Sequence, residues 1–334
     1  MTEVHDDGSS LILKGEDAIK ADYYIGFCLI PDFSSLAFIS AIEPLRLANR
    51  EAGRTIYSWK CYSVDGQPAK SSAGLEFPVS GSISEMPKQS IIFLCGGMDI
   101  QTHCTPQIMT AIRKAASYGA GIGAICTATY VLAKAGMLKN QRCTIHWENT
   151  SGFKEEFPDL DITTELFEID NNRFTCAGGT AALDMMLSLI STHTNHELAL
   201  AVADQLIHHR IRQGTERQRM ELRARLGVSH PKLLAAIACM EENLEEPYSC
   251  GGLAVEVGLS IRQLERLFQK YMGFSPTRYY LNLRLERARS LLAQTSMPII
   301  EVALACGFVS ASHFSKCHRE HFGQTPSEER SARR

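Results

Sequence analysis

The feature that most constrains the fold of this chain is a repeat in its C-terminal third. The segment LAVEVGLSIRQLERLFQKYMGFSP begins at Leu253, and VALACGFVSASHFSKCHREHFGQTP begins at Val302. Ala254 aligns with Ala303 at an offset of 49, and the offset becomes 50 later in the segment. Each copy predicts a helix, a glycine-containing turn and a second helix, so the segment predicts two helix-turn-helix units.

Local signals place the ends of these helices. Gly258 and Gly307 predict the end of the first helix in each copy, because glycine accepts a positive φ. Ser260 and Ser310 are placed to cap the second helix, which in a helix-turn-helix enters the major groove of DNA. The amphipathic run RYYLNLRLERARSLLAQ, from Arg278, predicts a long helix that joins the two units.

These motifs, together with LRLERARSLL, EVALACGF and the closing FGQTP, resemble the DNA-binding domain of the AraC/XylS transcription regulators from Pro231 to the end. The resemblance implies that one helix of each unit reads bases and that the protein works with RNA polymerase on double-stranded DNA. His318 departs from the family pattern, which usually has an aromatic residue there. The implied base readers are Arg262, Glu265, Arg266, Ser312 and Lys316. The implied phosphate contacts are Ser260, Ser310 and Arg284.

The charge distribution differs between the C-terminal segment and the rest of the chain. The formal net charge is −3 over 334 residues. From Leu253 to Arg334 there are 12 basic and 7 acidic residues, which leaves 22 basic and 30 acidic residues in the remainder. A basic segment of +5 attached to an acidic body of −8 indicates that only the C-terminal part meets a polyanion, although a chance imbalance of surface charge would look the same.

The N-terminal body alternates apolar β-rich runs with helical ones from Tyr23 onward. This pattern predicts an α/β domain with a flavodoxin-like, mostly parallel sheet sandwiched by helices, followed by the all-α domain with its two helix-turn-helix units. Ligands of such sheets bind beyond the carboxyl ends of the strands. One predicted strand, IIFLCGG, ends at Gly96 and Gly97, whose backbone N–H groups are expected to bind an anion or a carbonyl oxygen.

A second strand end, in GIGAICTATYVLAKAG, places Cys126 between a strand and a helix, as in a nucleophile elbow. A thiol at a helix N-terminus is expected to have its thiolate stabilised. The eleven cysteines are scattered without a C-x-x-C pair, so neither a disulfide framework nor a zinc site is expected, and a reducing cytoplasm is favoured. No other metal and no cofactor are expected.

The motifs LCGG, AICTATYVLAKAGML and TIHW resemble the PfpI-like branch of the class I glutamine amidotransferase-like superfamily, over Tyr23 to Ser191. Active thiol hydrolases of that superfamily often carry His directly after Cys, where this chain has Thr127. His146 is a possible base, but no convincing orienting group is evident, so Cys126 and His146 are interpreted as vestigial and the domain as a sensor and not an enzyme. A cysteine-dependent amidase or protease, or a thiol redox sensor, are the alternatives.

The resemblance also implies an activator that responds to a small nitrogenous metabolite and controls its catabolic genes. A carboxylate of the inducer is expected at Gly96, Gly97 and Thr127. Phe33 and Trp147 would face a quaternary amine such as carnitine or glycine betaine, whereas Glu43 would pair with the guanidinium of arginine. The expected ligand-binding set is Gly96, Gly97, Cys126, Thr127, His146, Trp147, Phe33 and Glu43.

The expected organisation is a disordered leader at 1–22, a ligand-sensing domain at 23–195, a helical linker at 196–230 and a DNA-binding domain at 231–334. A homodimer formed through the sensing domain is expected. No apolar run reaches the 18 residues of a membrane span, so no membrane contact is expected.

Overall fold

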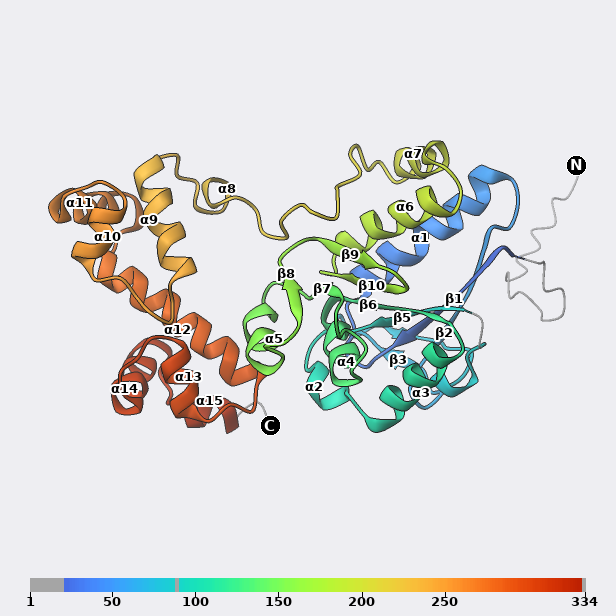
Figure 1. The fold of residues 1–334 in the computed structure, drawn as a ribbon, viewed down its shortest axis with the longest axis horizontal. Helices are drawn as coiled ribbons and strands as arrows, with labels where there is room; N and C mark the ends of the chain where they lie inside the picture. Colours follow the sequence, from blue (N-terminus) through green and yellow to red (C-terminus); the bar gives the residue numbers. More distant parts are fainter. Residues whose placement is uncertain (1–20, 88–89, 332–334) are drawn as a thin grey trace, which may run out of the picture.

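The computed structural model describes residues 21–87 and 90–331, so residues 1–20 of the expected leader lie outside the described part. The chain forms an α/β domain followed by an all-helical domain (Figure 1). Both parts of the predicted architecture are confirmed.

The first domain is built on a six-stranded sheet with the order β2-β1-β5-β6-β10-β9. All neighbouring pairs are parallel except β9 with β10. The register aligns Ile25 of β1 with Ile91 of β5, and Phe93 of β5 with Gly123 of β6. The strands are β1 Tyr23–Leu29, β2 Tyr57–Tyr62, β5 Ile91–Cys95, β6 Gly121–Ile125, β9 Phe167–Asp170 and β10 Arg173–Cys176. Short pairs lie outside this sheet: β3 Ala69–Lys70 with β4 Glu76–Phe77, and β7 Arg142–Thr144 with β8 Asp161–Thr163.

Helices cover both faces of the sheet (Figure 1). The first face carries α1 Ser35–Ala52, α6 Ala181–His193 and α7 His196–Gln205. The second face carries α2 Ile100–His103, α3 Pro106–Ser117 and α4 Thr129–Lys134. The domain also contains the 3₁₀ turns η1 Ile83–Glu85 and η2 Cys126–Ala128 and the helix α5 Thr150–Glu156. The central strands are buried on both faces, which explains their continuous apolar runs.

The connection between the domains differs from the expected helical linker. Helix α7 packs on α1 and α6, so the first domain continues past residue 195 to Gln205. Between α7 and α9 only α8, Leu222–Leu226, is helical. The non-helical segment after α7 is attached to the first domain through Arg212, whose guanidinium Nη2 lies 2.6 Å from the fully buried carboxylate of Asp184. A side-chain ion pair, and not a helix, therefore holds this part of the connection.

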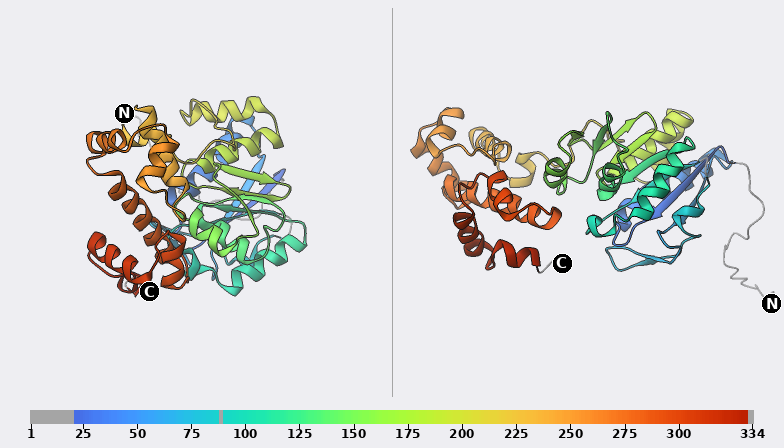
Figure 2. Two further views of the ribbon diagram at one scale, coloured as in Figure 1. Left: turned by 60° about the vertical axis from the view of Figure 1, so that its left-hand side comes forward. Right: turned by 60° about the horizontal axis from the view of Figure 1, so that its bottom comes forward.

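The second domain contains the two predicted helix-turn-helix units. The first unit is α10 with α11, the second is α13 with α14, and the 19-residue α12 runs between them (Figures 1 and 2). Gly258 and Gly307 have φ values of 64° and 72° in the turns, as predicted for glycine there. The helices are α9 Pro231–Glu242, α10 Cys250–Glu256, α11 Ile261–Met272, α12 Pro276–Gln294, α13 Ile299–Ala305, α14 Ala311–Phe322 and α15 Pro326–Ser331.

Candidate functional site

The carboxyl ends of β5 and β6 open into a cavity of about 510 Å³. The loops after these two strands, the loop between β7 and α5, and the C-terminal end of α12 all contribute to its wall. This is the edge at which ligands of parallel sheets bind. The lining residues are Ser34, Ser72, Gly97, Met98, Asp99, Gln101, Cys126, Thr127, His146, Glu148, Asn149, Ala293 and Gln294.

Cys126 has the backbone geometry of a nucleophile elbow but not the expected acidity. Its φ is +64°, and it is the first residue of the short turn η2, directly after β6. The side chain is only 8% exposed, and burial raises the pKa of its thiol to about 12. The expectation of a stabilised thiolate is therefore wrong, because burial raises the pKa more than the hydrogen bond from the Thr127 backbone lowers it.

The surroundings of Cys126 do not assemble a catalytic triad. His146 lines the same cavity, and burial lowers the pKa of its imidazole. Its Nδ1 lies 3.7 Å from Glu148 Oε2. Within residues 21–87 and 90–331, no hydrogen bond joins the Cys126 thiol to His146, and Thr127 Oγ1 donates to Gly97 O at 2.7 Å.

The two glycines after β5 serve packing at least as much as ligand access. A Cβ on Gly97 would lie 2.0 Å from Asp32 O, and one on Gly96 would lie 2.6 Å from Ala128 N. Gly96 N donates to Ile125 O at 3.1 Å, so this N–H is not free to bind an anion, and the expectation for Gly96 is corrected. Gly97 remains in the cavity wall.

The cavity is negatively charged without compensation. Its lining contains the carboxylates of Asp99 and Glu148 and no Lys or Arg among the residues that the structure describes. Both acidic residues are exposed, and His146 is the sole neighbour within ion-pair distance of either in the described part of the chain. A small cation would therefore be attracted to this cavity. Sequence reasoning missed both residues, although Asp99 follows LCGG closely and Glu148 follows TIHW directly.

Three of the expected ligand contacts lie elsewhere. Phe33 is fully buried and packs edge-to-face on Phe38 and Phe77, so it belongs to the core and cannot present its ring to a ligand. Trp147 lines a separate hollow, where the guanidinium of Arg219 lies 4.6 Å from its ring centroid. Glu43 lies on the surface of α1, outside the cavity wall. Its carboxylate forms an ion pair with Arg46 at 2.7 Å.

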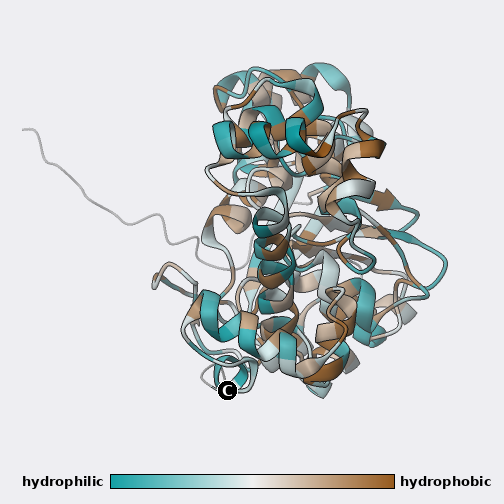
Figure 3. Ribbon diagram, turned by 90° about the vertical axis from the view of Figure 1, so that its left-hand side faces the viewer, coloured by the Kyte–Doolittle hydropathy of each residue, from teal (hydrophilic) through white to brown (hydrophobic). Residues whose placement is uncertain are grey.

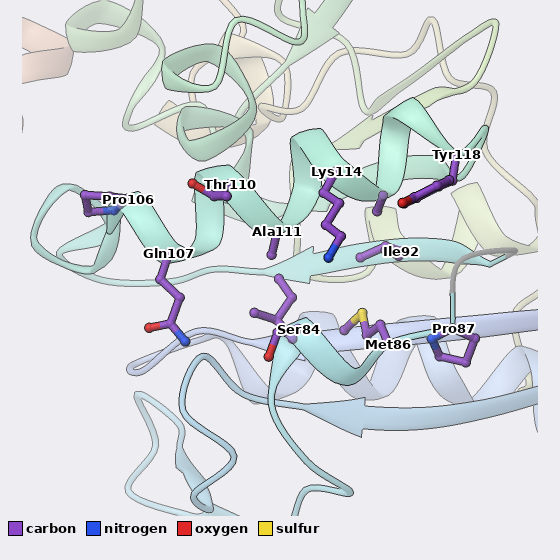
Figure 4. A pocket seen from close by; sticks show the side chains of 12 residues that line it. Ser84, Met86, Pro87, Ile92, Pro106, Gln107, Thr110, Ala111, Lys114 and Tyr118 are labelled. Atoms are coloured by element: carbon purple, nitrogen blue, oxygen red, sulfur yellow. The ribbon is translucent and has the colours of Figure 1, made fainter.

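A further hollow of about 440 Å³ lies between α3 and the segment around η1, with Ile92 of β5 in its wall (Figure 4). Lys114 and Gln107 extend from α3 toward Ser84 and Met86. Its wall is mostly apolar and contains none of the elbow or strand-end residues. The cavity beside Cys126 is therefore the better candidate for a ligand site.

The second helix of each helix-turn-helix unit presents polar side chains to the outside. Ser260 caps α11 by accepting from Gln263 N at 3.3 Å, and Ser310 caps α14 by accepting from His313 N at 3.2 Å. Figure 3 looks onto this side of the molecule and shows hydrophilic residues on the outer turns of the helices. The exposed members of the expected base-reading set are Arg262, Glu265 and Arg266 on α11 and Ser312 and Lys316 on α14.

Arg284 does not lie in this polar surface, which corrects the expectation of a phosphate contact. Its Nε donates to Cys306 O and its Nη2 to Gly307 O, both at 2.7 Å. The guanidinium also lies 4.3 Å from the ring centroid of Phe308, and burial lowers its pKa. Arg284 therefore binds α12 to the turn of the second unit.

His318 is another interior side chain of the second unit. It is fully buried between Phe314 and Phe322, and its Nδ1 lies 2.8 Å from Gln324 O. The imidazole thus fills an aromatic position and adds a hydrogen bond to the backbone after α14.

No helix in the described part of the chain is long and apolar enough to cross a bilayer.

Comparisons with known proteins match both domains. Residues 25–192 match the DJ-1/PfpI family, and residues 253–332 match a helix-turn-helix domain family. The chain is 48% identical over 306 residues to the HTH-type transcriptional regulator GbdR of Pseudomonas aeruginosa, covering 92% of this chain and 83% of that protein. It is 41% identical to the regulator CdhR of the same organism, covering 91% and 90% of the two chains.

The first domain is also similar to a solved structure. A crystal structure of an AraC family transcriptional regulator from Pseudomonas putida aligns with a TM-score of 0.50 and 27% identity. The alignment covers 55% of this chain and 99% of that one. A sheet domain of this type is thus found in another regulator.

Proposed function

Since this chain belongs to the AraC-type transcriptional regulators with an N-terminal DJ-1/PfpI domain, we propose that its cavity binds a small nitrogenous cation or zwitterion as inducer. The observation that carries this proposal is the pair of carboxylates, Asp99 and Glu148, in a cavity whose described lining has no Lys or Arg. Inducer binding would then activate the genes for catabolism of that compound, in the cytoplasm.

The lining distinguishes two classes of inducer. The carboxylates and the side-chain amide oxygens of the wall can accept hydrogen bonds from the N–H groups of an arginine guanidinium. A quaternary amine such as glycine betaine or carnitine would depend on the charge of Asp99 and Glu148, because no Phe, Tyr or Trp is among the lining residues. In this proposal the carboxylate of either compound would lie against the backbone at Gly97 and Thr127.

The state of Cys126 supports a binding role for the domain. A thiol with a pKa of about 12 is almost entirely protonated at neutral pH, and the thiolate is the nucleophile in cysteine catalysis and the reactive species in oxidation. Neither cysteine hydrolysis nor redox sensing is favoured by this environment. We infer that the domain is a sensor and not an enzyme.

On DNA, each subunit would present α11 and α14 to successive major-groove faces about 10 base pairs apart. Arg262, Glu265 and Arg266 would read the first face, and Ser312 and Lys316 the second. Ser260 and Ser310 would lie near phosphates while capping their helices. Two subunits would form a homodimer through the first domain and recruit RNA polymerase.

A thermal-shift screen of amino acids and methylated amines tests the inducer proposal. At a ligand concentration of 100 times Kd, binding stabilises the folded protein by about 2.7 kcal/mol, or roughly 5–10 °C for a domain of this size. The double variant Asp99→Asn/Glu148→Gln should lose the shift, and the control Glu43→Gln, outside the cavity, should retain it. The proposal fails if no cationic compound shifts the wild type, or if the double variant responds like the control.

A further inference from the structure

The loop that follows β7 has two sides. His146 and Glu148 line the cavity beside Cys126, whereas Trp147, between them, lines a separate hollow of about 860 Å³. In that hollow the guanidinium of Arg219 lies 4.6 Å from the centroid of the Trp147 ring. Arg219 belongs to the connection between α7 and α9. The loop therefore links the candidate ligand site to the segment that leads to the second domain.

The beginning of this loop is fixed by Gln218. Its Nε2 donates to Ile145 O at 2.9 Å and to Glu165 O at 3.0 Å. The backbone N of Gln218 also donates to Thr164 O at 3.2 Å, so both the main chain and the side chain of this residue hold the connection against the first domain. A displacement of the loop is therefore confined to the residues after Ile145, which are the ones that face the cavity and Arg219.

The segment after Arg219 leads to the first helix-turn-helix unit. Helix α8 follows at once, and its Arg225 donates from Nη2 to Glu241 of α9 at 2.9 Å. Helix α9 packs against α10 and α11. On its other flank the loop is bonded to α12, since Gln294 Nε2 donates to Glu148 O at 3.0 Å. The loop thus contacts both segments that lead from the sensing domain to the DNA-reading units.

The alternation of side chains along the loop sets the direction of its response. A cation in the cavity attracts the carboxylate of Glu148. Because Trp147 lies on the other side of the same loop, movement of Glu148 into the cavity draws the Trp147 ring away from Arg219. Ligand binding and the cation–π contact therefore oppose each other, and each weakens the other by the same factor.

We propose that Trp147 and Arg219 form a ligand-sensitive latch, which holds the connection to α8 in the ligand-free protein and is released by inducer in the cavity. Release frees the segment that leads into α8, so that the DNA-reading units change position relative to the sensing domain. Trp147 and Arg219 are thus positioning residues for the transcriptional response and touch neither the inducer nor DNA. This inference rests on the proposed function, since it describes regulation through the same cavity.

Tryptophan fluorescence of the full chain tests the latch. The chain has two tryptophans, Trp59 and Trp147, so the variant Trp59→Phe reports on Trp147 alone. L-arginine or glycine betaine at saturation should increase the quenching of Trp147 by acrylamide, because the guanidinium no longer covers the ring. In Trp59→Phe/Arg219→Ala the quenching should be high without ligand and change little when ligand is added. Trp59→Phe/Arg223→Ala should behave like Trp59→Phe, because Arg223 lies on α8 outside the hollow.

Isothermal titration with the same compounds measures the coupling. Arg219→Ala and Trp147→Leu should each bind the compound about two- to fivefold more tightly than the wild type, the factor expected when a cation–π contact that opposes binding is removed. Trp147→Leu keeps the charge of Arg219, so it separates loss of the contact from a general effect of charge on a cationic ligand. Both variants should also activate transcription without the compound, whereas Arg223→Ala should keep the wild-type Kd and still require it.

The outcomes separate this inference from the proposed function. If the wild type binds neither compound, the proposed function fails for these compounds, and the latch fails with it. If a compound binds but leaves the quenching of Trp147 unchanged or lowers it, the latch alone is overturned. The latch is also overturned if Arg219→Ala tightens binding and Trp147→Leu does not, or if Arg223→Ala tightens it equally, since charge and not the contact would then be responsible.

Discussion

Replacing Arg284 tests whether this arginine stabilises the fold or contacts DNA. The side chain donates to the carbonyls of Cys306 and Gly307 and lies over the ring of Phe308. In Arg284→Ala both carbonyls lose their charged donor, and the end of α13 loses its attachment to α12. We expect the second helix-turn-helix unit to be destabilised as a result.

The magnitude follows from the contacts. Hydrogen bonds that involve a charged group contribute about 1.5–3 kcal/mol each, and a cation–π contact about 0.5–1 kcal/mol near the surface. Arg284 is only partly buried, so the lower values apply. The free energy of unfolding should fall by about 3 kcal/mol, measured by urea denaturation followed by circular dichroism. Arg284→Lys should recover little, because Lys lacks the planar fork that meets two carbonyls.

The salt dependence of DNA binding distinguishes this structural role from a phosphate contact. Loss of one phosphate contact lowers the slope of log K against log salt by about 1. Arg284→Ala should keep the wild-type slope, whereas Arg266→Ala, on the exposed face of α11, should change binding and keep the wild-type stability. A variant Arg284→Ala with normal stability and a reduced slope would refute the structural role.

Further predictions concern buried groups. Native Cys126 should react with iodoacetamide at pH 8 at least about a thousandfold more slowly than an exposed thiol, by mass spectrometry, because so little thiolate forms; labelling at the exposed rate would contradict the raised pKa. Asp184→Ala removes the fully buried carboxylate that pairs with Arg212, and it should lower the free energy of unfolding by about 3 kcal/mol. Arg210→Ala breaks a surface ion pair and should lower it by less than about 1 kcal/mol. Equal losses of stability in the two variants would contradict this ranking. Burial lowers the pKa of His318 in the folded state, so its contribution to stability is present above about pH 6.5 and is lost as the pH falls through the folded pKa. Urea titrations from pH 5 to 7.5 should show that His318→Phe removes part of this dependence, and an unchanged pH profile would contradict it.

The repeat allows the helical domain to be predicted closely from the sequence. Helix ends depend on local chemistry, so the residue types at Ser260 and Ser310 are enough to assign them as caps, and those at Gly258 and Gly307 to assign them as turn residues. The strand that ends at Cys126 is equally clear, because an apolar run followed at once by a helical pattern is a local signal.

The cavity wall is much less predictable, because its members come from distant segments. Asp99, Glu148 and Gln294 meet only through the folding of the first domain and the docking of α12 on it. Whether an aromatic residue at a strand end faces a ligand or the core also depends on tertiary packing, and Phe33 faces the core.

The effect of burial on the pKa of the Cys126 thiol cannot be predicted for the same reason. The pKa of a thiol depends on how far the thiol is buried as well as on the residues next to it in the chain, and the sequence shows only those residues. Arg284 shows the corresponding problem on a helix, since an arginine that binds carbonyls and one that binds phosphate have the same sequence pattern.

Reconstituted transcription tests the central claim most directly. The template would carry an operator selected from random DNA by the purified protein, and transcript would be measured with and without the compound that stabilises the wild type. The wild type should respond to the compound, whereas Asp99→Asn/Glu148→Gln should bind the operator without responding and Arg262→Ala/Arg266→Ala should fail to bind it. Transcription that ignores the compound in the wild type, or an unchanged response in the cavity variant, would contradict a regulator controlled through this cavity.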